Sequence, residues 1–193
     1  MSKTQKQQHL DKAEQILAGA LPEFLQHGYA RTSMDRIASA AGVSKQTLYT
    51  HFGDKDGLFN AILKQMAREK FQLVCSKPLE GEPEQVLRDL AQRLLKEVND
   101  PDHLAFVRLI VAESVNHPES PKLFLIHVVQ PALKILTEYL EQHQKLKDCE
   151  AIARIFVGAL IHHIITQEIL HGKEIIPIEE ERIVDNLIKL IVH

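Results

Sequence analysis

Apolar residues recur three or four positions apart along nearly all of this chain, and this spacing restricts it to helical folds. Between residues 13 and 24, one helical face would carry Ala13, Ile16, Ala20 and Phe24. No run of alternating β-branched residues bounded by hairpin turns interrupts the pattern. We therefore predict an all-α fold of about nine helices.

Glycines and capping residues predict where several of these helices begin and end. Gly28 ends the first helix, Thr32 and Asp35 resemble a capping box that opens the second, and Ser44 suits the N-cap of the third. The predicted helices cover about 9–27, 33–41, 44–51, 55–75, 83–98, 101–115, 120–144, 148–171 and 178 to the last residue.

Prolines predict the irregular points of the chain. Pro22 and Pro131 fall inside predicted helices, where the missing N–H and the crowded ring favour a bend. The segment 76–83 reads SKPLEGEP and has the composition of a linker. It divides the chain into an N-terminal domain, 1–54, with a linking helix to about 75, and a C-terminal domain, 76–193.

Charge is distributed unevenly along the sequence. The net charge is −3, but residues 1–70 hold ten basic and seven acidic side chains, so the N-terminal part is basic and the remainder acidic. A basic end suits a polyanion. No stretch approaches 18 apolar residues and the polar N-terminus lacks a signal-peptide core, so we expect a cytoplasmic protein without a membrane span. Cys75 and Cys149 form no CxxC or metal-ligand pattern.

The first 55 residues have the pattern of a helix-turn-helix. Ile37 and Leu48 can pack the second and third helices against the first, and Ala41-Gly42 permits close approach at the turn. The third helix would then present polar side chains outward, its first residues toward a DNA major groove. These outward residues are Lys45, Gln46, Thr47, Tyr49, Thr50 and His51.

These residues, in this order, resemble the signature of the TetR family of transcriptional regulators. The matching positions run over about residues 10–60. They are Gly28-Tyr29, Thr32, Ile37-Ala38, Ala41-Gly42-Val43-Ser44, Thr47-Leu48-Tyr49, His51-Phe52, Lys55 and Leu58.

The resemblance implies that the third helix reads double-stranded DNA. Lys45, Gln46, Thr47 and Thr50 match family positions that face bases, and Thr32, Tyr49, His51 and Lys55 match positions that contact phosphates. Ser33 and Ser44 complete the predicted DNA-binding set. Repression of a near-palindromic operator is the usual outcome in the family, and activation remains open.

The last two predicted helices carry wider apolar stripes than a single core needs. The resemblance implies that they pair with a second copy in a homodimer, which would present two DNA-binding helices. The predicted interface residues are Ile155, Ala159, Ile183, Leu187 and Ile191. The alternative is that both helices belong entirely to the core of one chain.

The resemblance also implies a pocket for a small-molecule effector in the C-terminal domain. Binding there would shift the fourth helix and change the separation of the two DNA-binding heads. The candidate pocket residues are Phe106, Ile110, Glu113, His117, Phe124, His127, His163, Thr166 and Gln167.

Three other functions can be weighed against this prediction. A helical ligand-binding protein with a non-functional DNA-binding head is the first. A metal-responsive regulator is the second: the chain has eleven histidines, but they form no compact ligand motif, so we assign no metal residue. An enzyme is the third, and the sequence shows no nucleophile elbow, phosphate-binding loop or HExxH motif. We therefore predict no catalytic residue and no cofactor.

Overall fold

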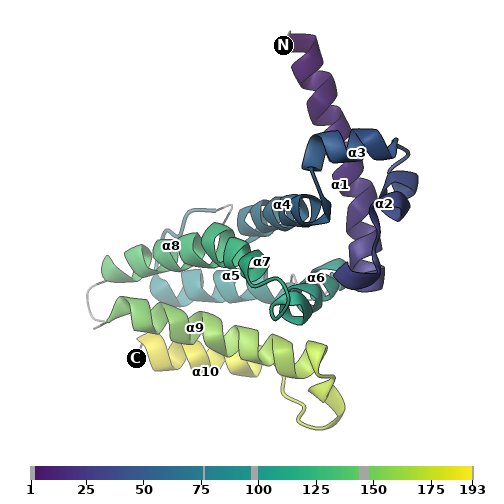
Figure 1. Cartoon of the computed structure of the whole chain (residues 1–193). Coiled ribbons are helices and arrows are strands. Elements are labelled where there is room, and N and C mark those ends of the chain that lie inside the picture. The colour runs from purple at the N-terminus through teal and green to yellow at the C-terminus, as the bar shows by residue number, and fades with distance from the viewer. Residues whose placement is uncertain (1–2, 76, 97–99, 144–147, 193) are drawn as a thin grey trace. The chain divides into compact units, whose positions relative to one another are not determined.

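The computed structural model describes residues 3–75, 77–96, 100–143 and 148–192, and every element in these ranges is helical (Figure 1). The all-α prediction is confirmed, while the helix ends predicted at 98, 144 and 193 lie outside the described residues. The elements are α1 (Lys3–Arg31), α2 (Met34–Ala40), α3 (Lys45–Phe52), α4 (Lys55–Cys75), α5 (Pro83–Lys96), α6 (Pro101–Glu113), α7 (Glu119–Phe124), η2 (Leu125–Val129), α8 (Gln130–Glu141), α9 (Cys149–Ile164), η3 (Ile165–Ile169), η4 (Gly172–Glu174) and α10 (Glu180–Val192).

The described residues pack into two compact units, each with its own core. The head unit comprises the chain up to Ala67 together with Ala105–Phe124, and the body unit comprises Arg68–Leu104 and the chain from Leu125 onward. Packing therefore places most of α6 and all of α7 with the N-terminal helices. The functional boundary near residue 75 stays a prediction from sequence.

The core of the head unit forms where α1, α2 and α3 meet α4 and α6. Phe24, Ile37 and Leu48 are fully buried in it, as the apolar pattern predicts. The close approach of α1 to the turn between α2 and α3 depends on Gly19. A Cβ at Gly19 would lie 2.6 Å from the Cα of Ala41 in that turn. Such a contact would force the backbones apart, so this small residue fixes how tightly the helix-turn-helix seats on α1.

The start of α2 differs from the predicted capping box. Ser33 is the N-cap, and its Oγ accepts from the backbone N–H of Arg36 at 3.2 Å. Thr32 instead turns inward and is 1% exposed, with its Oγ1 donating to the carbonyl of Gly28 at 2.7 Å. The capping box predicted from Thr32 and Asp35 was wrong because the hydroxyl of Thr32 is used to close the end of α1.

Helical distortion occurs at Gly28 and before Pro131. Backbone dihedrals stay helical through Pro22, and α1 breaks at Gly28, whose φ of 72° and ψ of 172° suit glycine. The π-helical turn η2 directly precedes Pro131, which stands at the start of α8. Since proline removes an N–H and crowds the preceding turn, this irregularity is the expected local response.

The body unit packs α5, α8, α9 and α10 around one apolar core. Buried residues of this core include Leu87, Leu140, Phe156 and Ile188, one from each helix. In Figure 1, α9, in light green, and α10, in yellow, lie side by side. Arg88 of α5 pairs with Asp185 of α10 at 2.6 Å on the rim of this core.

Two helical segments are long and apolar enough to cross a membrane by length and composition alone, Glu119–Glu141 and Cys149–Ile169. Core helices of soluble proteins meet the same criterion. Only 17% and 33% of the apolar window of each segment is buried within the chain, so both leave apolar surface uncovered.

Candidate nucleic-acid interface

The N-terminus of α3 is organised by its own side chains. Ser44 is the N-cap, and its Oγ accepts from the backbone N–H of Thr47 at 3.0 Å while also lying 2.8 Å from the Thr47 hydroxyl. Serine is among the best N-caps because it satisfies a backbone donor that the helix leaves open. The predicted start of this helix at Ser44 is confirmed, and the cap fixes the direction in which the next residues point.

Four residues of α3 form one exposed surface. Lys45, Gln46, Tyr49 and Thr50 line a shallow open hollow of about 510 Å³. Tyr49 is 43% exposed although it is aromatic, and the fully buried Leu48 lies beside it on the core side. We call these four residues the α3 surface. Ammonium, amide, phenol and hydroxyl groups can donate to or accept from base edges and phosphates, so this surface has the chemistry that DNA recognition needs.

Lys45 is held by an ion pair with a residue of the preceding helix. Its Nζ lies 2.7 Å from Oδ1 and 3.0 Å from Oδ2 of Asp35, which stands in the first turn of α2. The hydrogen bond to Asp35 and the charge of that carboxylate raise the pKa of Lys45. Both side chains are more than half exposed, so the pair orients Lys45 without contributing much stability.

His51 and Thr50 are tied to the backbone of their own helix. The Nδ1 of His51 lies 2.8 Å from the carbonyl oxygen of Thr47, and the Thr50 hydroxyl donates to the carbonyl of Gln46 at 2.8 Å. His51 is half-buried, whereas Thr50 is exposed. Both side chains therefore have restricted positions before any partner arrives.

Lys55 is directed toward the protein itself. Its Nζ donates to the carbonyls of Tyr29 and Thr32 at 2.9 and 3.0 Å, and it lies 4.1 Å from the centre of the Tyr29 ring. Two backbone acceptors and an aromatic ring are strong partners for an ammonium group. Lys55 therefore joins the start of α4 to the loop between α1 and α2. The buried Thr32 belongs to the same junction.

Tyr29 stands at the centre of this junction. Its hydroxyl donates to Asp56 of α4, and its ring lies 4.1 Å, centre to centre, from the imidazole of His117. The Nδ1 of His117 is also 3.5 Å from Oδ1 of Asp56. Burial, followed by the hydrogen bond to Asp56 and the charge of its carboxylate, raises the pKa of Tyr29. Sequence reasoning missed Asp56 as a partner, since nothing in the local pattern relates it to Tyr29.

Comparison with known protein families agrees with this geometry. The profile of bacterial regulatory proteins of the tetR family matches residues 16–62, which include the whole helix-turn-helix. The profile of the C-terminal domain of AefR-like transcriptional repressors matches residues 85–193, more than half of the chain. The chain belongs to the tetR family.

Individual relatives of this tetR-family chain are named as regulators. It is 31% identical to the HTH-type transcriptional regulator AcrR of Shigella flexneri over 77% of this chain and 69% of that protein. It is 35% identical to the "Probable acrEF/envCD operon repressor" of Escherichia coli K12 over 46% of this chain, and it spans only 41% of that repressor's length. The solved structure of the flavonoid-responsive regulator FrrA is similar, with a TM-score of 0.78, 26% identity, and coverage of 93% of this chain and 94% of that one.

These similarities show a member of the tetR family of bacterial regulatory proteins. They confirm the predicted family, the helix-turn-helix followed by a helical C-terminal domain, and the prediction that the chain is not an enzyme.

The structure divides the residues predicted to line an effector pocket between the two units. Those in the head unit are Phe106, Ile110, Glu113, His117 and Phe124, and those in the body unit are His127, His163, Thr166 and Gln167. Phe106 and Ile110 are buried in the core of the head unit, and the ring of Phe124 lies 6.1 Å from that of Phe106. His127 is exposed on η2, and Thr166 donates to its own helix backbone. His163 and Gln167 line one common hollow.

The residues predicted for the dimer interface are not equally available to a partner. Leu187 and Ile191 are 7% and 8% exposed and belong to the core of their own chain. Ala159 and Ile183 are half-buried, whereas Ile155 is 61% exposed on α9. Of the five, Ile155 is the one that stands well clear of the intrachain core, and the interface itself stays a prediction.

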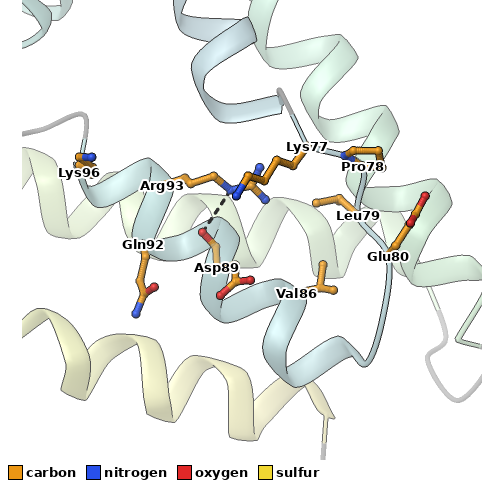
Figure 2. A pocket seen from close by; sticks show the side chains of 9 residues that line it. All are labelled: Lys77, Pro78, Leu79, Glu80, Val86, Asp89, Gln92, Arg93 and Lys96. Atoms are coloured by element: carbon orange, nitrogen blue, oxygen red, sulfur yellow. Dashed lines mark hydrogen bonds between the residues drawn. The ribbon is translucent and has the colours of Figure 1, made fainter.

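The body unit also has a polar hollow beside α5. Figure 2 shows this space of about 410 Å³, which residues 77–80 and one side of α5 enclose. The Nε of Arg93 donates to the backbone carbonyl of Asp89 at 3.3 Å within it. Lys77 and Lys96 add two cations to the lining, and Glu80 and Asp89 add two carboxylates. No group of three or more His, Cys, Asp or Glu side chains suited to a metal ion occurs among the residues that the structure describes.

Proposed function

We propose that this chain is a homodimeric repressor that binds a near-palindromic operator through α3 and leaves it when a small molecule binds the C-terminal domain. The observation that carries the DNA-binding step is the α3 surface, where Lys45, Gln46, Tyr49 and Thr50 are exposed together on a capped helix. A helix that presents such side chains from its first turns fits the major groove. Operator binding places the protein in the cytoplasm, where the chromosome lies.

Dimerisation is supported by an apolar face that the chain leaves open along α9 and at Ile165, the first residue of η3. Ile155, Ile161 and Ile165 are 61%, 41% and 39% exposed, and a Cβ added to Gly158 among them would meet no atom within 4 Å. We call these four residues the α9 face. Their spacing places them along one side of a helix, where a second copy of the same helix can pack closely. Two copies would supply the two heads that a palindromic operator needs.

Release by an effector is supported by the names of relatives and by the hollows of the body unit. The similar structure FrrA is called flavonoid-responsive, and the Escherichia coli relative is called a probable operon repressor. A ligand that binds one arrangement of the dimer about 100-fold more tightly than another would supply about 2.7 kcal/mol of coupling.

DNA binding across a salt series tests this function. Purified protein should bind DNA from upstream of its own gene tightly, selectively and as a dimer, with affinity that falls steeply as salt rises. Tyr49→Ala should lose most of this binding while the circular dichroism spectrum stays helical. Gln92→Ala is the control, because Gln92 is also exposed but belongs to α5 of the body unit and not to the α9 face. Weak binding that is equal on any DNA would contradict the proposal.

A further inference from the structure

The turn between α2 and α3 decides where α3 lies in the head unit. Ala41 is the C-cap of α2, and Gly42 follows it with a left-handed φ of 63°. Val43 comes next, and Ser44 then caps α3. Because this turn is so short, a displacement of Ala41 also displaces the first residues of α3, which carry part of the α3 surface.

The side chain of Gln15 on α1 is bonded to this turn. Its Nε2 donates to the backbone carbonyl of Ala41 at 2.8 Å. Carbonyls at the end of a helix have no partner within the helix, so they need a donor from elsewhere. Gln15 supplies that donor and joins the end of α2 to α1.

Lys12 determines which end of the Gln15 amide faces the turn. The Nζ of Lys12 donates to Oε1 of Gln15 at 2.8 Å. An amide carries its acceptor on the oxygen and its donors on the nitrogen, so this bond leaves Nε2 directed at Ala41. Both side chains are exposed, and the core of the head unit consists of other residues. Burial of apolar surface therefore does not explain the arrangement.

A steric contact with α1 limits the same turn in the opposite direction. Gly19 stands one helical turn after Gln15, and its backbone lies against Ala41. This contact prevents the turn from moving closer to α1, whereas the bond from Gln15 resists movement away from it. At the start of α2, Arg36 pairs with Glu23 of α1. Polar contacts thus join α2 to α1 at both ends, and the contact of Gln15 is the one beside α3.

We propose that Gln15 is a positioning residue for operator recognition, because it holds α3 where its side chains meet the base edges. The inference rests on the proposed function and deepens it, since it concerns the selectivity of the α3 surface. Hydrogen bonds to base edges depend on accurate placement, whereas attraction to phosphates acts on DNA of any sequence. Loss of the bond therefore reduces selectivity more than it reduces the general affinity for DNA.

Gln15→Met tests this role without a change of charge. Methionine has a similar length and helix propensity but no N–H donor. Fluorescence anisotropy of the full chain, at a temperature where every variant is folded, compares DNA from upstream of its gene with a scrambled sequence. We expect about threefold to tenfold lower affinity for the upstream DNA, and a change within about twofold for the scrambled DNA. Gln26→Met, the same substitution at an exposed position near the other end of α1, should change neither affinity.

Hydrogen exchange of the free protein, followed by NMR, tests the bond in the absence of DNA. The backbone N–H of Val43 donates to the carbonyl of Ala38 at 3.0 Å, across the turn that Gln15 holds. This N–H should exchange about threefold to tenfold faster in Gln15→Met and at an unchanged rate in Gln26→Met.

Two results would overturn the proposal. The first is an affinity of Gln15→Met that is unchanged, or that falls equally for upstream and scrambled DNA, since neither outcome reflects a role in selectivity. The second is an unchanged exchange rate at Val43, which would mean that the side chain does not hold the turn. Failure of the unmodified chain to distinguish the two DNAs would instead contradict the proposed function, and hydrogen exchange would still decide whether Gln15 holds the turn.

Discussion

The imidazole of His117 lies against the phenol ring of Tyr29, with the ring centres 4.1 Å apart. Tyr29 follows the break of α1 at Gly28, whereas His117 belongs to the turn between α6 and α7. Asp56 at the start of α4 contacts both, through the Tyr29 hydroxyl and through the Nδ1 of His117. Three segments that are distant in sequence thus meet at one point of the head unit.

Replacing His117 tests how much this contact stabilises the head unit. His117→Ala removes the ring contact and the approach to Asp56, and should lower the free energy of unfolding by about 1 kcal/mol. His117→Phe should recover most of that loss because it keeps an aromatic ring. Urea denaturation measures both, with His127→Ala as the exposed control. Equal stability of all three variants would show that the ring contact contributes nothing.

The hydroxyl of Tyr29 should make stability depend on alkaline pH. Burial and Asp56 raise the pKa of Tyr29 above the ordinary value of 10.0. The folded chain therefore keeps this proton at a pH where the unfolded chain has lost it. Its contribution is fully present below pH 10 and decreases as the pH rises above that value.

Tyr29→Phe should make the fall in unfolding free energy above pH 10 less steep, as measured by urea denaturation at successive pH values. Tyr139→Phe is the counterpart in the body unit, where burial and then the charge of Glu82 raise the pKa of Tyr139. An identical pH profile for Tyr29→Phe and the unmodified chain would contradict the assignment.

Substitution of Lys55 distinguishes a structural role of this residue from the phosphate contact that the family resemblance implies. If its bonds to the Tyr29 and Thr32 carbonyls are what matter, Lys55→Met should lower the free energy of unfolding by about 2 kcal/mol. If Lys55 contacts a phosphate, the slope of log affinity against log salt should instead shrink by about one. Lys64→Met, an exposed substitution on the same helix, should change neither quantity appreciably. We expect Lys55→Met to lower the free energy of unfolding while the salt dependence of DNA binding changes little.

Local signals in the sequence predict the helices and the exposed surface of α3. Ser44 is followed by a helix because its side chain caps it, and helical periodicity alone then separates the buried Leu48 from the exposed Tyr49. These features depend on residues within a few positions of one another. For the same reason, the sequence predicts that Lys45 faces outward.

The contacts between distant segments could not be predicted in the same way. The inward direction of Lys55 depends on where α4 meets the loop after α1, and the pairing of Lys45 with Asp35 depends on the angle between α2 and α3. His117 was predicted to line a pocket because the family resemblance implies one, and its ring contact with Tyr29 could not be read from the sequence. Each outcome is decided by packing that a single amphipathic pattern does not specify.

Asp35 should restrain DNA binding through its ion pair with Lys45. A phosphate approaching Lys45 must compete with a carboxylate 2.7 Å away, and Asp35 adds a negative charge near the DNA. Asp35→Asn should therefore raise the affinity for non-specific DNA by about threefold to tenfold at low salt and reduce the preference for the operator.

Fluorescence anisotropy with operator and scrambled DNA measures both effects of Asp35→Asn. Glu14→Gln, an exposed change of the same charge on α1, is the control for net charge. Lower affinity of Asp35→Asn for every DNA would mean that the ion pair positions Lys45 for binding instead of restraining it.

The α9 face should hold the proposed dimer together. Ile155→Arg with Ile161→Arg places two charges on this exposed apolar face, and burying them against a second copy would cost several kcal/mol. We expect monomers in analytical ultracentrifugation, with unchanged helical content and greatly reduced operator affinity.

Val111→Arg is the control, because Val111 on α6 is equally apolar and exposed, and this variant should remain dimeric. Leu187→Arg is unsuitable for this purpose, because Leu187 lies in the chain's own core and its loss would unfold the body unit. A double variant that still sediments as a dimer would move the interface away from α9.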